Sequence, residues 1–136
     1  TDRGGTFYRC EFVRNKAKTV GAISGWAATT AYNCKIVENS SLTSCAACTK
    51  VSLYDCLIER NTAVDGDLGV VGQNFRANRC IFTGNYESTV LISSSNISEL
   101  RNCLFVSNTI SSTSAKIAMI APSAYNCTAY GKQLRR

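Results

Sequence analysis

Apolar and polar positions recur along this chain with a period of about 23 residues, and one cysteine marks each copy. The six marker cysteines are separated by 24, 22, 24, 23 and 24 residues: Cys10, Cys34, Cys56, Cys80, Cys103 and Cys127. With the cysteine as position 0, every copy has an apolar residue at −3 and at +2, and a polar residue at −1. Five copies carry an asparagine at +5: Asn15, Asn39, Asn61, Asn85 and Asn108. Such a repeat is typical of a solenoid, in which each copy forms one coil.

The alternation around each cysteine predicts a β-strand that runs through it. Positions 0 and +2 share one face and position −1 the other, because successive side chains of a strand point to opposite sides. Coils stacked at the ~4.8 Å spacing of hydrogen-bonded strands would place like residues above one another. We therefore expect inward ladders of Cys, of Phe or Ile, and of Asn. The Asn is expected at a left-handed corner, bonded to the Asn of the next coil.

Tyrosine recurs at position −2, as Tyr8, Tyr32, Tyr54 and Tyr125. Counting by two from the cysteine favours the interior for these rings. Rings on the outside would instead make an aromatic strip suited to stacking on sugars.

Two solenoid architectures fit the spacing of these positions. The order apolar-x-x-Cys-x-apolar-x-x-Asn also matches the first half of a leucine-rich repeat. The second halves of the copies decide against that reading, because they contain Ser, Thr, Gly and Val in place of spaced leucines and helix formers. Segments such as Val90–Ile92 and Lys116–Ile120 are predicted as further short strands. The sequence thus predicts an all-β parallel β-helix of about six coils, with three short strands per coil and one domain over residues 1–136.

Short motifs within the copies resemble those of polymorphic outer membrane protein repeats. Three segments read F-x-x-N, two read I-x-x-N and one reads G-G-T-F: Phe12–Asn15, Phe82–Asn85, Phe105–Asn108, Ile36–Asn39, Ile58–Asn61 and Gly4–Phe7. The resemblance implies a right-handed β-helix displayed at a cell surface, with a role in adhesion. The double glycine occurs once here, rather than in every coil as in that family.

The composition excludes some kinds of catalytic and metal site. The 136 residues include no His, which removes the commonest general base and the commonest metal ligand. The net charge of +6 fits a solvated surface and leaves acidic polysaccharide as a candidate partner, with no nucleic acid expected. No apolar run approaches the ~20 residues of a membrane span. Because the chain starts at Thr1 without Met, we interpret it as an excised piece or a unit of a larger assembly.

The outward row at position −1 is where catalytic residues would be expected, since β-helix enzymes that act on polysaccharides line one sheet with charged residues. Asp55 is the single carboxylate of that row, whereas glycoside hydrolysis needs two facing carboxylates. Asp65 and Asp67 are interpreted as a turn rather than a Ca²⁺ site. We therefore expect no catalytic residues, metal or cofactor. The leading hypothesis is a non-enzymatic structural or adhesive module of an extracellular or cell-surface assembly, and the alternative is a carbohydrate-binding or carbohydrate-active β-helix.

Two cysteines lie outside the repeat, and the chain also contains three N-x-S/T sequons. Cys45 and Cys48 are either buried filler or a local disulfide, and without a second C-x-x-C or a His they predict no zinc site. Of the three N-x-S/T sequons, Asn39 belongs to the buried ladder, which leaves Asn96 and Asn126 as candidates for glycosylation.

The two ends of such a solenoid would expose bare coils with open hydrogen-bonding edges. We therefore expect self-association or a protein partner at the end coils.

Overall fold

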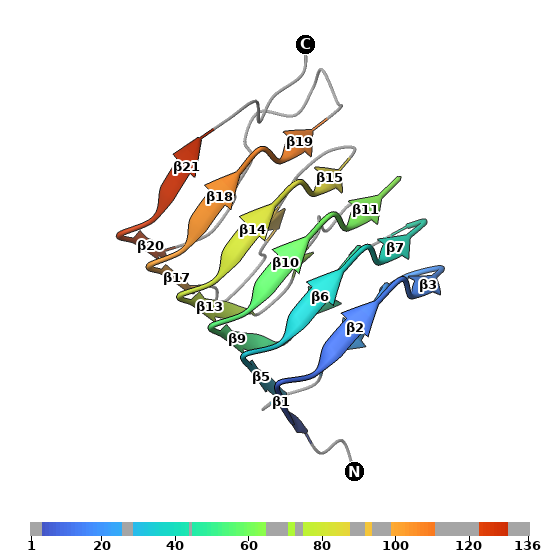
Figure 1. Ribbon diagram of the computed structural model, residues 1–136. Helices are drawn as coiled ribbons and strands as arrows, with labels where there is room; N and C mark the ends of the chain where they lie inside the picture. The colour runs from blue at the N-terminus through green and yellow to red at the C-terminus, as the bar shows by residue number, and fades with distance from the viewer. Residues whose placement is uncertain are drawn as a thin grey trace.

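The computed structural model describes residues 4–25, 29–43, 45–64, 71–72, 75–87, 92–93, 99–110 and 123–130. Throughout these ranges the chain winds as short parallel strands stacked coil upon coil (Figure 1). The same ranges contain no helix that could cross a membrane.

The strands form four parallel sheets, which run along the stack. Sheet A contains β1 (Thr6–Tyr8), β5 (Thr30–Tyr32), β9 (Ser52–Tyr54), β13 (Arg76–Asn78), β17 (Glu99–Arg101) and β20 (Ser123–Tyr125). Sheet B contains β2 (Glu11–Val13), β6 (Lys35–Val37), β10 (Leu57–Glu59), β14 (Ile81–Thr83), β18 (Leu104–Val106) and β21 (Thr128–Tyr130). Sheet C contains β3 (Lys16–Ala17), β7 (Ser40–Ser41), β11 (Thr62–Ala63), β15 (Tyr86–Glu87) and β19 (Thr109–Ile110). Sheet D contains β4 (Ile23–Ser24), β8 (Cys48–Thr49), β12 (Val71–Gly72) and β16 (Ile92–Ser93).

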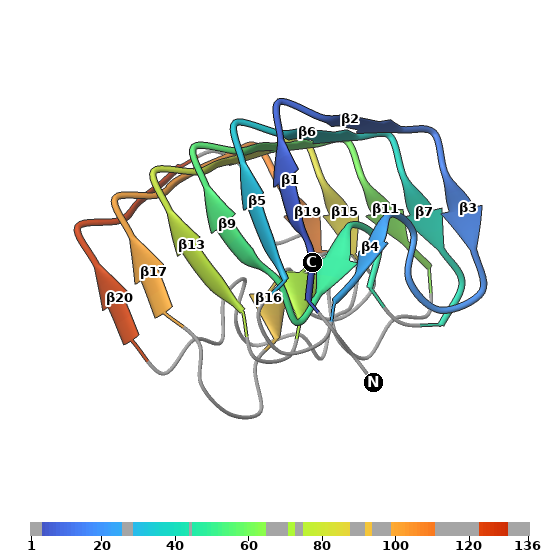
Figure 2. The same ribbon diagram turned by 90° about the horizontal axis from the view of Figure 1, so that it is seen from below.

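This arrangement confirms the predicted β-solenoid and refines the coil. Sheets A and B have six strands each, in agreement with the expected number of coils, and the described parts of sheets C and D have five and four. A coil therefore has four short strands rather than the predicted three. Seen along the stack, sheets A, B and C form three sides of the coil and sheet D lies across from sheet B (Figure 2). The strand predicted at Lys116–Ile120 lies outside the described residues.

The register between coils matches like positions to one another, as the repeat predicts. Phe7 lies opposite Ala31 in sheet A, and Phe12 lies opposite Ile36 in sheet B. The same pairing of position −3 with −3 and of +2 with +2 continues through the later coils. Like residues therefore stack along the solenoid.

Left-handed residues turn the chain between sheets, and they fall at other positions than expected. All six residues at position −1 have φ between 50° and 54°: Arg9, Asn33, Asp55, Arg79, Asn102 and Asn126. This row ends each strand of sheet A, so the prediction of one continuous strand through the cysteine was wrong. A second left-handed row falls at position +4, where φ lies between 50° and 62°: Arg14, Glu38, Arg60, Gly84 and Ser107. The left-handed corner thus precedes the ladder asparagine, which was itself expected to occupy it.

The interior is filled by the inward rows at −3, 0 and +2. In the third coil Leu53, Cys56 and Ile58 are exposed to 2 % or less. Phe82 and Phe105 stack with ring centroids 4.7 Å apart and planes inclined by 10°. Aromatic pairs of this kind contribute about 0.5–1.5 kcal/mol beyond the area they bury.

The cysteine ladder is part of this core. The thiols of the ladder hydrogen-bond to backbone carbonyl groups. Cys56 Sγ, for example, donates to the carbonyl of Tyr54 at 3.3 Å and lies 3.4 Å from the carbonyl of Ala31 in the preceding coil. None of the eight cysteines forms a disulfide. Cys45 and Cys48 are both fully buried and no disulfide joins them, which favours the filler interpretation of this pair.

The asparagine ladder bonds each coil to the next. Asn39 donates its backbone N–H and its Nδ2 to Oδ1 of Asn61, at 2.9 and 3.0 Å. Its Nδ2 also donates to the carbonyl of Phe12 in the preceding coil at 2.8 Å. The same bonds recur one coil on at each step, and the four inner members, from Asn39 to Asn108, are exposed to 1 % or less. The expected bonding between coils is confirmed.

Candidate functional site

The outer face of sheet A carries a stack of tyrosine rings. The centroids of Tyr8 and Tyr32 are 5.1 Å apart and those of Tyr32 and Tyr54 are 5.0 Å apart, with planes inclined by 10° and 17°. Tyr8 is 67 % exposed, so the interior placement predicted for these rings was wrong. The reason is the left-handed residue at −1, which interrupts the alternation that was counted from the cysteine.

The stack stops at the third coil and leaves one ring face open. The ring spacing is close to the ~4.8 Å between adjacent coils, so the rings lie across the long axis of the solenoid. The register partner of Tyr54 in the fourth coil is Asn78, a shorter side chain. A hollow of about 160 Å³ lies at this step, lined by Tyr54, Arg76, Ala77, Asn78, Glu99 and Arg101.

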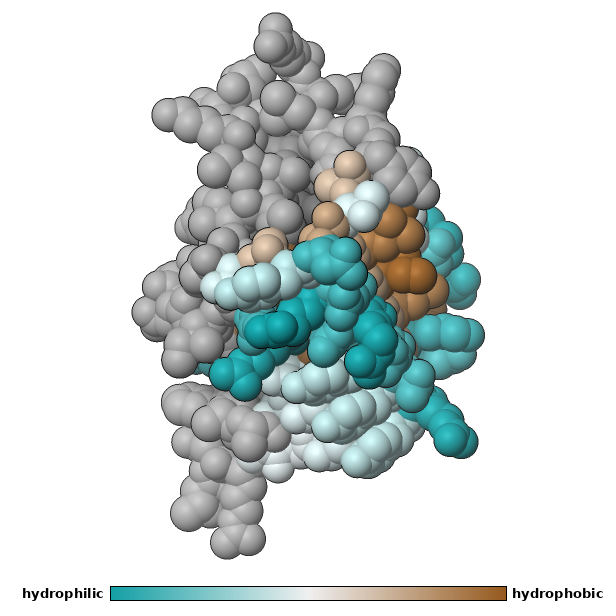
Figure 3. Space-filling view, turned by 90° about the vertical axis from the view of Figure 1, so that its left-hand side faces the viewer, coloured by the Kyte–Doolittle hydropathy of each residue, from teal (hydrophilic) through white to brown (hydrophobic). Residues whose placement is uncertain are grey.

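Charged side chains surround this hollow. Figure 3 looks onto the face, where pale side chains on the lower coils give way to strongly hydrophilic ones, in teal, on the coils above. Arg101 pairs with Glu99 and lies over the ring of Tyr125, 4.6 Å from its centroid. Arg76 is exposed and forms no ion pair with any residue that the structure describes. The hollow thus has an aromatic wall and guanidinium groups around it.

Asp55, the carboxylate singled out from the sequence, is held by an arginine. Arg79 donates from Nε and from an Nη to the two carboxylate oxygens, at 2.7 and 2.9 Å. Hydrogen bonds from this guanidinium hold the pKa of Asp55 below its ordinary value. A general acid must carry a proton, and the two hydrogen bonds from Arg79 favour the ionised form of Asp55, so Asp55 is unsuited to that role.

A comparison with protein families gives one match over most of this architecture. The model for the right handed beta helix region matches residues 1–132. The chain belongs to this family. Membership makes the coil of this β-helix right-handed, as the resemblance in its motifs implied. A search of curated proteins found no match to the chain.

Of the other sites predicted from the sequence of this β-helix, some lie in the described residues and some do not. Asn39, a ladder residue, is fully buried, as expected of that sequon. Asn126 is exposed at a corner, and its Nδ2 donates to Oδ1 of Asn102 at 2.6 Å. Asn96, Asp65 and Asp67 lie outside the described residues. Among the described residues, no three His, Cys, Asp or Glu side chains are grouped to hold a metal ion.

Sequence reasoning missed Arg76 at the tyrosine step of this β-helix. Arg101 shares position −2 with Tyr54, two coils along, where it interrupts the row of tyrosines. Arg76 occupies position −4 and pairs in register with Ser52, so the cysteine register could have placed it beside Tyr54. The left-handed row also had a signal, since four of its six members are Asn or Asp, residue types that are enriched in that conformation.

Proposed function

We propose that this chain is a non-enzymatic β-helix module with a structural and adhesive role in an extracellular or cell-surface assembly. We further propose that the outer face of sheet A binds an acidic polysaccharide. The observation that carries the proposal is the stack of Tyr8, Tyr32 and Tyr54, which ends at a hollow bordered by arginines. The F-x-x-N motifs, which resemble those of polymorphic outer membrane proteins, support the surface location.

Each part of this face suits one part of an acidic sugar. The apolar face of a sugar ring packs on an aromatic ring. Tyr54 offers one face of its ring, because its neighbour in the next coil is the shorter Asn78. A sugar carboxylate accepts paired hydrogen bonds from a guanidinium, and Arg76 is a guanidinium that has no ion partner in the described structure.

The arrangement supports binding rather than bond cleavage. Asp55 lies on the same side of the molecule, but its two oxygens are bonded to Arg79. Glu99, the carboxylate at the hollow, is paired with Arg101. Each of these carboxylates is paired with an arginine, whereas glycoside hydrolysis uses two carboxyl groups that face each other across the sugar bond.

The test compares binding of polygalacturonate and of neutral dextran by isothermal titration calorimetry. We expect polygalacturonate to bind, with an affinity that falls as salt is raised, and dextran to bind much less tightly. Tyr54→Ala should weaken binding by about 3- to 10-fold, the equivalent of one aromatic stacking contact. Tyr86→Ala is the matched control, because Tyr86 is 39 % exposed on sheet C, on another side of the coil. Equal affinity of the wild type and Tyr54→Ala would contradict the proposed face.

A cleavage assay on the same polysaccharide distinguishes the alternative, a carbohydrate-active β-helix. Product release is followed by reducing ends and by the absorbance of unsaturated uronides. We expect none from the wild type. Product that forms with the wild type and disappears in Asp55→Ala would overturn the non-enzymatic proposal.

The first described coil supports the structural part of the proposal. Phe7 and Phe12 are only partly buried, whereas their register partners Ala31 and Ile36 are fully buried. We propose that another copy of the coil packs on this apolar surface. Sedimentation equilibrium should then show association that Phe12→Glu reduces and Val13→Glu, on the neighbouring outward position, does not. A wild type that stays monomeric at every concentration would contradict self-association.

A further inference from the structure

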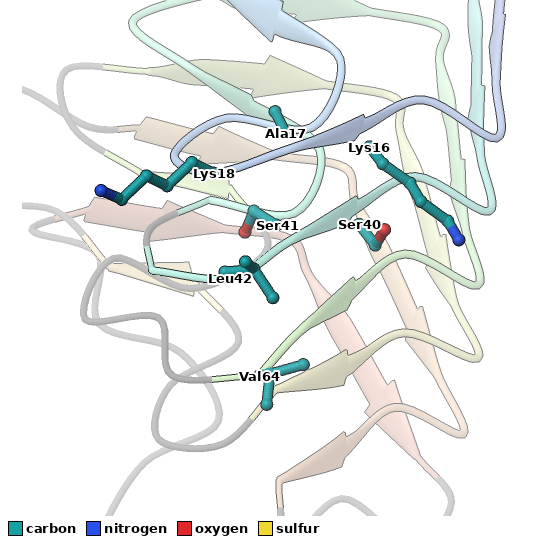
Figure 4. Close-up of a pocket in the computed structure, with 7 residues that line it drawn as sticks. All are labelled: Lys16, Ala17, Lys18, Ser40, Ser41, Leu42 and Val64. Carbon is teal, nitrogen blue, oxygen red and sulfur yellow. The ribbon is translucent and has the colours of Figure 1, made fainter.

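Besides the hollow on sheet A, the solenoid has a larger one of about 460 Å³ beside sheet C (Figure 4). Its two lysines, Lys16 and Lys18, extend to opposite sides. Ser41, the buried hydroxyl of its lining, lies in the row that faces the core, between Ala17 and Ala63. These polar groups do not converge, whereas aromatic and charged groups do converge at the smaller hollow on sheet A.

The hollow on sheet A occupies a gap in a column of stacked side chains at position −2. The rings of the first three coils follow one another at 5.1 and 5.0 Å and end at Tyr54. In the fifth and sixth coils the same position holds Arg101 and Tyr125, with the guanidinium carbon 4.6 Å from the ring centroid. The fourth coil has Asn78 there, in register with Tyr54 on one side and Arg101 on the other. Asn78 has no ring, so the column is open for one coil.

The gap has the height of one planar ring. Tyr54 and Arg101 are two coils apart, which is ~9.6 Å at the ~4.8 Å spacing of stacked strands. A ring placed midway would lie ~4.8 Å from each, within the range of about 4.5–7 Å for stacked aromatic rings and of up to about 6 Å for a cation over a ring. The contacts of 5.0 and 4.6 Å already present in the column have the same spacing. Both Tyr54 and Arg101 line the hollow, whose volume is about 160 Å³.

Arg76 adds a positive charge at the level of this gap. It lies two residues before Asn78 in β13, so both side chains are on the outer face of the same coil, with the buried Ala77 between them. The hollow also contains Glu99, but Arg101 pairs with that carboxylate. Arg76 forms no ion pair with any residue that the structure describes. A carboxylate at the edge of a ring in the gap can therefore accept hydrogen bonds from Arg76.

We propose that this gap binds a small aromatic carboxylate, with its ring between Tyr54 and Arg101 and its carboxylate on Arg76. The ring completes the column. Both walls are in place before the ligand arrives, because Tyr54 is stacked on Tyr32 and Arg101 is held by Glu99, so binding has little ordering to offset. The inference goes beyond the proposed binding of polysaccharide and does not rest on it. Both ligands would cover the open face of Tyr54, so they should compete.

The probe is sodium benzoate, titrated into the isotope-labelled protein and followed by NMR. Cyclohexanecarboxylate, which has the charge without an aromatic ring, and benzamide, which has the ring without the charge, are the matched ligands. We expect benzoate to cause saturable shifts in the third to fifth coils, and both other ligands to bind at least about 3-fold more weakly. A matched ligand that binds as tightly as benzoate would overturn the proposed chemistry, as would benzoate shifts that do not saturate. Polygalacturonate is titrated separately, so failure of either ligand leaves the other result intact.

Two variants test the gap and the charge separately. Asn78→Tyr introduces the residue type that the column carries in its first three coils, so it should fill the gap and abolish benzoate binding, with a melting temperature no lower than that of the wild type. Arg76→Gln should weaken benzoate by about 5-fold and leave benzamide unchanged. Arg9→Gln is the control, because it removes the same charge from the first coil, and it should leave benzoate binding unchanged. Benzoate that binds Asn78→Tyr or Arg76→Gln as tightly as the wild type would refute the site.

Discussion

Replacing Asn61 by Ala tests the asparagine ladder at its centre. The substitution removes four hydrogen bonds: the Nδ2 of Asn61 donates to Ile36 O and to Asn85 Oδ1, and its Oδ1 accepts from the N–H and the Nδ2 of Asn39. Asn85 Oδ1 keeps the bond from the backbone of Asn61, and Asn39 Nδ2 keeps its bond to the first coil. The N–H of Asn39 and the carbonyl of Ile36 lose the bonds described, in a fully buried environment.

The expected magnitude follows from these two groups. The N–H of Asn39 is left unsatisfied, which costs about 1–3 kcal/mol. The carbonyl of Ile36 keeps its place in the ladder between β6 and β10 and loses one further bond of about 1 kcal/mol, so together they predict a loss of about 3 kcal/mol in the free energy of unfolding. The matched control is Asn15→Ala, at the same position of the first coil. Asn15 is exposed, its Nδ2 makes one bond to Asn39 Oδ1, and the backbone N–H of residue 15 still bonds that oxygen. Its loss should be about 1 kcal/mol.

Urea unfolding at pH 7, followed by circular dichroism, measures both variants. Native-state hydrogen exchange adds a local readout, because the amide of Asn39 should lose protection in Asn61→Ala more than the strand amides of the same coil. Equal losses of stability in the two variants, or an unchanged Asn39 amide, would refute the view that these bonds hold the coils together.

Two further predictions concern packing and pH. Gly21→Ala should lower stability by about 1–3 kcal/mol in urea unfolding, because its Cβ would lie 2.0 Å from the carbonyl oxygen of Ala46, whereas Gly5→Ala, where a Cβ meets nothing within 4 Å, should change it little. Equal effects would contradict the packing. Burial raises the pKa of the Cys48 and Cys34 thiols, so the folded state keeps protons that the unfolded state loses above the ordinary thiol pKa of about 8.5. This contribution is complete below that pH and lost as pH rises toward the folded pKa, so any fall of the urea midpoint between pH 8 and 10 should be smaller in Cys48→Ala than in the wild type. An identical pH dependence of the two proteins would contradict it.

The rows that face the core could be predicted from the sequence, because burial restricts them most. Position +2 carries Phe or Ile in five of six coils, and position 0 is always Cys, so their period sets both the coil length and the register. The bonding of Asn39 to Asn61 followed from the same register. Such positions repeat because each must fit between its copies above and below.

The outer face of sheet A could not be predicted in the same way. Counting by two from the cysteine holds only within a strand, and a left-handed residue at −1 restarts the count, which places Tyr32 outside. The Asn and Asp residues at −1 are only a partial signal of this conformation, because Arg9 adopts it as well as Asp55.

The asparagine ladder also gives the stack a direction. Each of the first four ladder amides donates from Nδ2 to the Oδ1 of the next asparagine, on its C-terminal side, so this series of side-chain hydrogen bonds runs in one direction. At the first coil the ladder therefore offers an acceptor, Oδ1 of Asn15, which receives no donor from the described residues. A coil that extends the ladder there must bring a donor, and only a coil stacked with the same polarity does so. Growth of such a stack is head-to-tail by chemistry as well as by shape, and a head-to-head pairing would set two acceptors against each other.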